Sequence, residues 1–145
     1  MATDCCGNGE QLIFTCAGAA YCGQLANRSG VQAMTEGIGK LFCLAAVSAQ
    51  RDQKMPRARQ ASKRIAIDGC DEDCAKRTLE LAGLAVDVHV RITDLGIEKQ
   101  PQEPHWLVHT KRVVEKVREV LYGPQPKQAS PSQPSGCCGQ QRTDA

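Results

Sequence analysis

The sequence predicts an α/β fold: a single three-layer domain in which a mainly parallel four-stranded sheet is flanked by helices. Short apolar runs rich in strand-forming residues alternate along the chain with longer segments of helical periodicity. The chain has 145 residues, enough for one compact domain and some additional tail. We therefore expect a mobile leader at residues 1–10, the domain at residues 11–123, and a disordered tail at residues 124–145, which is rich in Pro, Ser and Gln.

The first half of the domain is expected to contain two strands and one long helix. A short apolar run that ends in a glycine-containing loop predicts a strand over residues 11–16. Apolar residues at helical spacing follow over residues 20–36. The continuous apolar run within residues 40–49 is typical of a strand that is buried on both faces. Residues 51–63 are polar and basic and contain Pro56, so they predict a loop or a short exposed helix.

The second half repeats the alternation of strand and helix. The apolar run RIAID predicts the third strand, and residues 70–83 predict a helix with an acidic start and a terminal Gly83. Alternating residues within 84–96 predict the fourth strand. An apolar stripe within residues 105–123 predicts an amphipathic helix. This order of elements favours parallel strand pairing, with helices on both faces of the sheet.

Composition excludes several classes of function. The 18 basic and 16 acidic residues nearly balance, and aromatic residues are scarce, so we expect no nucleic-acid partner. The sequence shows no secretory signal and no apolar run long enough to cross a membrane. We therefore expect a cytoplasmic protein with no membrane partner. Its 9 cysteines would stay reduced there, where cysteine clusters bind metals or perform redox chemistry more often than they form structural disulfides.

Three cysteines recur at a fixed interval. Cys16, Cys43 and Cys70 are separated by 27 residues and then by 27 again, and each lies in or just after a predicted strand. Equal spacing in a strand–helix repeat places equivalent residues at the same edge of a parallel sheet. Cys74, one expected helical turn after Cys70, adds a fourth thiol. Four thiolates form a closed tetrahedral zinc site, so the sequence predicts zinc as the cofactor and these four cysteines as its ligands.

The acidic residues between the last two of these cysteines favour a metal over a bare nucleophile. Asp71, Glu72 and Asp73 stand between Cys70 and Cys74. A helix N-terminus lowers the pKa of a thiol, but adjacent carboxylates oppose this effect. A divalent cation would make the local charge favourable.

Four separated motifs, LIFTCAGAAYCGQLANR, KLFCLAAVSA, RIAIDGCDEDCAKRTLELAG and ITDLGIEK, resemble the DGC family of zinc-binding proteins. The family takes its name from the tripeptide seen here as Asp68-Gly69-Cys70, and the resemblance covers about residues 11–121. It implies that Cys16, Cys43, Cys70 and Cys74 chelate zinc. It implies no particular reaction.

Five cysteines stand outside that pattern. Cys22 occupies the glycine-rich loop where the family pattern has a non-thiol residue. Two adjacent pairs, Cys5-Cys6 in the leader and Cys137-Cys138 in the tail, look like additions. Adjacent thiols close a strain-free disulfide poorly but capture soft ions, so a soft metalloid is a candidate partner of these pairs.

A thiol-dependent enzyme is the alternative function. The loop after Cys16 is similar to the phosphate-binding loop of low-molecular-weight tyrosine phosphatases and related arsenate reductases. In those enzymes an arginine six residues after the cysteine clamps the oxyanion. Cys22 stands at that position here, and Arg28 lies well into the expected helix. Two classes therefore stay open: a metal-thiolate protein that buffers, senses or transfers a metal or metalloid, which we favour, and a thiol enzyme or redox protein.

Overall fold

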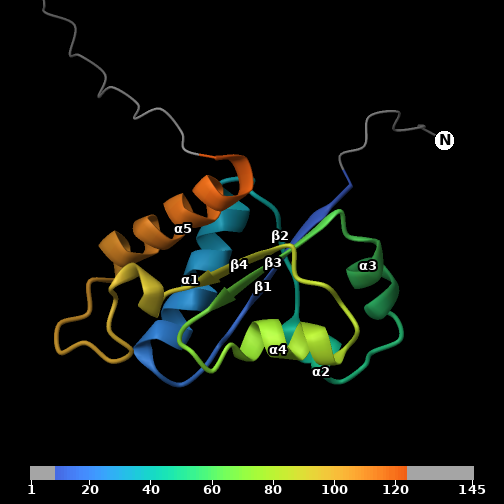
Figure 1. Cartoon of the computed structure of the whole chain (residues 1–145), viewed down its shortest axis with the longest axis horizontal. Helices are drawn as coiled ribbons and strands as arrows, with labels where there is room; N and C mark the ends of the chain where they lie inside the picture. The colour runs from blue at the N-terminus through green and yellow to red at the C-terminus, as the bar shows by residue number, and fades with distance from the viewer. Residues whose placement is uncertain (1–8, 124–145) are drawn as a thin grey trace, which may run out of the picture.

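The computed structural model describes residues 9–123 (Figure 1). Its sheet has four strands, all parallel, in the order β2-β1-β3-β4. The predicted α/β fold with a parallel four-stranded sheet is therefore confirmed. The strands are β1 (Gln11–Thr15), β2 (Lys40–Leu41), β3 (Lys63–Asp68) and β4 (Val88–Arg91). The cysteine pairs at positions 5–6 and 137–138 lie outside the described residues.

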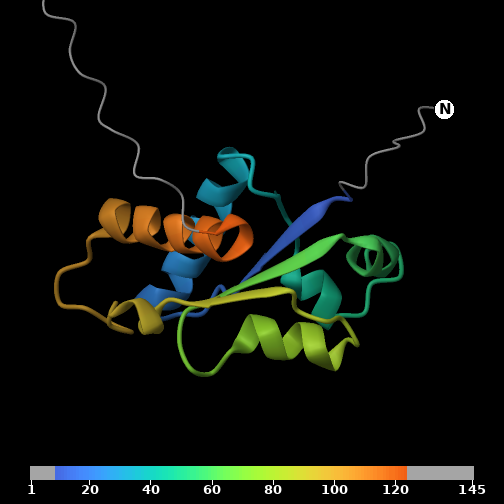
Figure 2. The same ribbon diagram turned by 45° about the horizontal axis from the view of Figure 1, so that its top comes forward.

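Helices cover both faces of the sheet (Figures 1 and 2). One face carries α1 (Tyr21–Thr35) and α5 (Trp106–Tyr122), which also pack against each other. The opposite face carries α2 (Leu44–Ser48), α3 (Met55–Gln60) and α4 (Cys74–Leu81). A short 3₁₀ turn, η1 (Thr93–Leu95), follows β4. Among the described residues, no helix combines the length and the apolar character that crossing a membrane requires.

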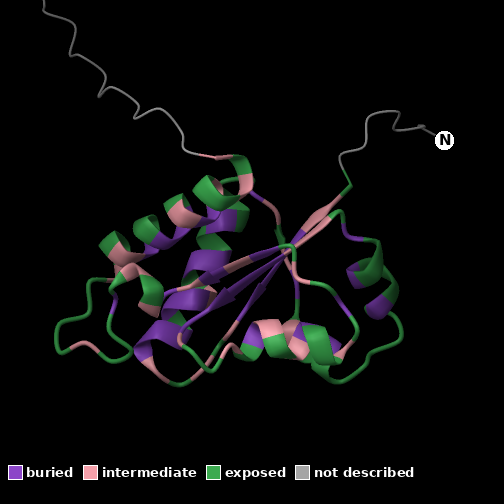
Figure 3. Cartoon of the chain, viewed as in Figure 1, coloured by how far each residue is buried: buried purple, intermediate pink, exposed green. Residues whose placement is uncertain are grey.

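Buried residues line the strands and parts of the helices (Figure 3). The alternation of side chains along the strands divides this core into two layers. In β1, Ile13 points to the face of α1 and α5, whereas Leu12 and Phe14 point to the face of α2, α3 and α4. In β3, Ile65 and Ile67 take the first face and Ala66 takes the second. All six side chains are fully buried, so the sheet is the common wall of both layers.

The expected strand within residues 40–49 is wrong over most of its length. After β2 the Phe42 N–H donates to the carbonyl of Ile13, and the chain then turns into α2. The run Leu-Ala-Ala that follows Cys43 consists of strong helix formers, and in α2 only Val47 is buried. An apolar run of this length does not distinguish a buried strand from a short helix.

The helix expected over residues 70–83 begins later than the sequence suggested. It starts at Cys74, so Cys70 and the acidic residues after it form a loop, and Cys70 does not lie on the helix. Asp73, directly before the helix, has a left-handed backbone with φ of +50°. That conformation is uncommon for a residue other than glycine, although aspartate tolerates it. The predicted termination at Gly83 is confirmed by its φ of +73°.

Candidate metal centre

The strand order reverses between β1 and β3. From β1 the chain crosses through α1 to β2 on one side, and β3 then pairs with the other side of β1. The helices α1 and α4 leave this point toward opposite faces of the sheet, and such a point, beyond the carboxyl ends of the strands, is where open α/β sheets generally bind ligands. Cys16 directly follows β1, and Cys70 lies two residues after β3. The Cys16 N–H donates to the Ile67 carbonyl at 3.0 Å, which ties the two strand ends together.

The four cysteines predicted as ligands all lie at this carboxyl end of the sheet. Cys16 and Cys70 are partly buried, whereas Cys43 and Cys74 are exposed. Cys74 is the first residue of α4, and Cys43 directly precedes α2. Although Cys74 is exposed as a residue, partial burial of its sulfur raises the pKa of the thiol, and the neighbouring Cys16 adds to the rise. The structure therefore brings Cys16 and Cys74 close together.

Cys43 stands apart from Cys70 in the sheet. Its strand, β2, pairs with β1, and β1 separates it from β3. The carboxyl ends of β2 and β3 are thus two strand spacings apart, about 10 Å. Cys16 and Cys70, by contrast, follow strands that are direct neighbours.

Cys22 is a further thiol of this region, and the sequence pattern predicts no role for it. It is the second residue of α1 and is only 1% exposed. Burial raises the pKa of the Cys22 thiol, and the adjacent Cys70 thiol raises it further. The one signal in the sequence was its departure from the family pattern, which marked the position without indicating a contact with Cys70.

Lys99 is a second residue that sequence reasoning missed. Its ammonium group lies beside Cys70, which raises the pKa of Lys99. The Lys99 carbonyl accepts a hydrogen bond of 3.2 Å from the Cys22 N–H. The loop after η1 therefore covers the start of α1 and places one positive charge against the thiols. Nothing in the spacing along the chain connects Lys99 with Cys70.

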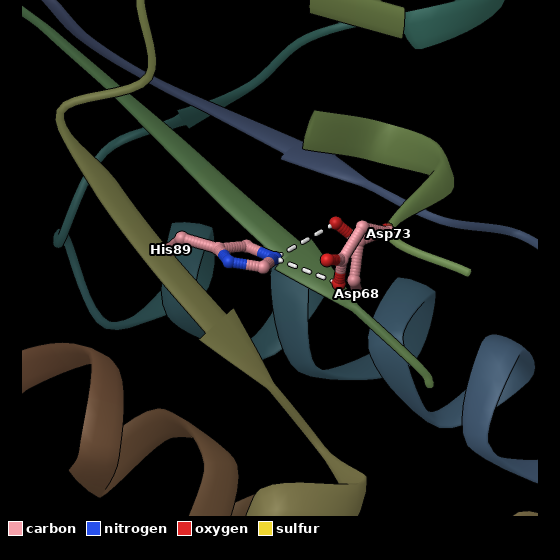
Figure 4. Close-up of side chains that lie close together, drawn as sticks. All are labelled: Asp68, Asp73 and His89. Carbon is pink, nitrogen blue, oxygen red and sulfur yellow. Dashed lines mark hydrogen bonds and ion pairs between the residues drawn. The ribbon is translucent and has the colours of Figure 1, made fainter. Parts of the chain in front are cut away.

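Two carboxylates and a histidine form a cluster in this part of the sheet: Asp68 ends β3, Asp73 directly precedes α4, and His89 lies within β4 (Figure 4). The Nε2 atom of His89 lies 3.0 Å from Oδ2 of Asp68 and 3.5 Å from Oδ1 of Asp73. Donor atoms of these three residues all lie within 4.8 Å of one another, and no other group of three potential ligands in residues 9–123 is gathered as closely.

The hydrogen bonds that surround this cluster indicate that it stabilises the start of α4. The buried Asp68 accepts hydrogen bonds from the backbone N–H groups of Ala75 at 2.7 Å and Lys76 at 3.1 Å. Arg91 donates two hydrogen bonds to Asp73, at 2.9 and 2.6 Å, and thereby lowers the pKa of Asp73. With its carboxylates occupied by N–H groups and a guanidinium, the cluster holds the start of α4 against β3 and β4.

The start of α1 offers little room for an oxyanion. The N–H of Tyr21 donates to the side chain of Gln100 at 2.9 Å, and the N–H of Cys22 donates to Lys99. Arg28 lies over the ring of Trp106, 6.0 Å from its centroid. A phosphate-binding loop needs free N–H donors and an arginine beside them. Two N–H groups at the start of α1 therefore already have acceptors, and Arg28 is engaged with Trp106.

The fold and the site together indicate a class of protein: a parallel α/β domain with several thiols at the carboxyl ends of its strands. Residues 12–119 match the DGC domain, and the chain belongs to this family. Family membership indicates a metal-binding role for the domain. The chain is also similar to the anaerobic and virulence modulator AnvM of Pseudomonas aeruginosa, with 26% identity over 89 residues. This alignment covers 61% of the chain and 68% of AnvM. No solved structure matches the chain.

Proposed function

We propose that this protein binds one zinc ion through cysteine thiolates at the carboxyl edge of its sheet. The observation that carries the proposal is the position of Cys16 and Cys70 at neighbouring strand ends, with Cys74 opening α4 beside them. The 27-residue spacing of the sequence predicts Cys43 as the fourth ligand, but Cys43 follows the edge strand β2, which β1 separates from β3. The site belongs to the DGC domain, which spans most of the chain.

The chemistry of the donor set fits zinc. Thiolates are preferred ligands of zinc, and structural zinc sites are commonly formed by four of them. Four thiolates and one divalent cation leave a net charge of about −2. The Lys99 ammonium next to Cys70 offsets part of that charge. When bound, the ion would tie together strand ends and helix starts that are far apart in the sequence, so zinc binding would contribute to folding free energy.

The described histidines favour metal binding over thiol catalysis. Thiol enzymes commonly pair the nucleophilic cysteine with a histidine that acts as base. Here His89 is held by Asp68, and His109 contacts the hydroxyl of Tyr21 at 2.9 Å. His105 packs edge-on against His109. Each of the three histidines thus has its partner outside the thiol group, and the relative AnvM is named as a modulator. We propose a role in buffering, sensing or transferring metal.

Metal content is the direct test of this function. Full-length protein purified without added metal should carry about one zinc ion per chain, measured by elemental analysis against amino-acid quantitation. A strong chelator should remove the zinc and lower the melting temperature, because the metal stabilises the folded state only. Protein that refolds normally, carries no transition metal and gains no stability from added zinc would refute the proposal.

A further inference from the structure

The point where the strand order reverses brings together four segments of the chain. Two are the strand ends, which carry Cys16 and Cys70. The other two are the starts of α1 and α4, the helices that leave this point toward opposite faces of the sheet. Cys22 lies at the start of α1 as Cys74 lies at the start of α4. Each of these four segments thus contributes one thiol.

Backbone contacts fix the start of α1 against the loop that carries Cys70. A Cβ added to Gly69 would lie 2.8 Å from both the carbonyl carbon of Cys22 and the nitrogen of Gly23. Cβ atoms are essentially never found so close to backbone atoms, so the DGC loop touches the helix start directly. This contact holds Cys22 and Cys70 side by side, and it needs a glycine between Asp68 and Cys70.

Cys22 and Cys70 also share their surroundings. Both pack in the core layer under α1 and α5, and Cys16 packs against the same layer. A Cβ added to Gly18 would lie 3.4 Å from the sulfur of Cys16 and 3.9 Å from the Cα of Gly23, so Cys16 borders the start of α1 as well.

We propose that Cys22 is the fourth zinc ligand, completing a tetrahedral set with Cys16, Cys70 and Cys74, and that Cys43 lies outside this set. The inference rests on the proposed zinc function and specifies its ligands. Cys16 and Cys70 follow neighbouring strands, and Cys22 and Cys74 lie at the starts of the helices beside them, whereas Cys43 follows the edge strand β2. A buried ligand also suits a closed structural site, which admits no water to the metal.

Cobalt(II) distinguishes the two candidate ligands, because the intensity of the thiolate-to-cobalt absorption band rises with the number of thiolates bound. The titration uses the full-length chain with serine at positions 5, 6, 137 and 138, so that the terminal pairs add no signal. In that chain Cys22→Ser should remove about a quarter of the band, the share of one ligand in four, and weaken cobalt binding. The affinity for cobalt should fall at least about tenfold. Mutation of a residue that only hydrogen-bonds to a metal ligand already lowers metal affinity by about that factor, and Cys22 would itself be a ligand. The matched variant Cys43→Ser should keep the full band and affinity.

Alkylation of the cobalt-loaded chain gives a second measurement that does not depend on whether Cys22→Ser folds. Mass spectrometry should show Cys43 modified rapidly and Cys16, Cys70 and Cys74 protected. A loss of band in Cys43→Ser, with or without a loss in Cys22→Ser, or protection of Cys43 by the metal would overturn the assignment of Cys22 and leave the zinc function standing. A wild-type chain that develops no thiolate band would overturn the zinc function itself.

Discussion

The carboxylate of Asp68 lies 2.7 Å from the backbone nitrogen of Ala75 and accepts its hydrogen bond from seven residues away in the chain. Asp73, which directly precedes α4, makes no side-chain capping bond to the helix. Asp68 caps it from the end of β3 instead. The first residue of the DGC tripeptide thus sets the position of the helix start that carries Cys74.

Replacing Asp68 by asparagine should destabilise the protein by about 3 kcal/mol. The backbone N–H groups of α4 lose a carboxylate acceptor, and the side-chain NH₂ of the new asparagine would face one of these N–H groups. Zinc affinity should fall about tenfold as the start of α4 loosens. Denaturant unfolding and competition with a zinc chelator measure the two effects. The exposed Asp94→Asn is the control, with an expected change in stability below about 1 kcal/mol. Equal behaviour of the two variants would show that Asp68 does not brace the helix.

Glu10 should titrate far below the usual range of a glutamate. Arg57 donates two hydrogen bonds of 2.7 Å to its carboxylate, and Lys40 lies 2.9 Å away. These partners lower the pKa of Glu10 from 4.5 to about 2. Because the pKa is lower in the folded state than in the unfolded chain, the stabilisation by Glu10 is complete above about pH 4.5 and is lost as the pH falls through 2.

Carboxyl-carbon NMR can follow this titration directly. Arg57→Gln should return the midpoint most of the way to the ordinary value, and Lys40→Gln should return it less, since Arg57 has the larger effect. A wild-type midpoint near 4.5 would contradict the ion pairs at the start of β1.

Gly69→Ala should separate Cys22 from Cys70, since the added methyl group meets backbone atoms at 2.8 Å. We expect a loss of stability of about 2 kcal/mol, typical of an overpacked contact, and weaker zinc binding. Gly37→Ala is a matched control: its φ of +75° imposes strain of about 1 kcal/mol, but no atom lies within 4 Å of the new Cβ. Isothermal titration with zinc should show unchanged affinity for Gly37→Ala. A similar affinity for Gly69→Ala would mean that the close contact is not needed for binding.

The terminal cysteine pairs should bind soft thiophilic species independently of the zinc centre. Thiolates select soft ions, and each pair supplies two adjacent thiols. Arsenite titration should therefore show fewer bound equivalents after removal of residues 124–145, whereas the zinc content should stay the same. The serine variant of Cys137 and Cys138 in the full-length chain controls for loss of the segment itself. Identical arsenite binding by all three proteins would rule out capture by Cys137 and Cys138.

The alternation of strand and helix could be predicted because it follows from local periodicity. The termination at Gly83 follows from a single residue whose backbone preference is strong. The sequence does not show that the strand expected within residues 40–49 is mostly a helix. A short apolar run is compatible both with a buried strand and with a short edge strand followed by a helix. The start of α4 depends on contacts of Asp68 and Arg91, which join distant segments.

For the candidate site as well, the spacing of residues along the chain predicted one part, and contacts between distant segments decide the rest. The 27-residue interval indicated that Cys16, Cys43 and Cys70 reach one edge of the sheet, which the strand ends bear out. An interval along the chain does not give the order of strands, and that order places β1 between β2 and β3. The approach of Cys22 and Lys99 to Cys70 depends on loop packing and had no signal in the spacing.

X-ray absorption at the zinc edge identifies the atoms that bind the metal. The measurement uses the zinc-loaded full-length chain with serine at positions 5, 6, 137 and 138, so that only thiols of the domain can bind. We expect four sulfur neighbours at about 2.3 Å from the zinc. A shell dominated by nitrogen or oxygen at about 2.0 Å would contradict it and would assign the metal to carboxylate and histidine ligands such as Asp68, Asp73 and His89.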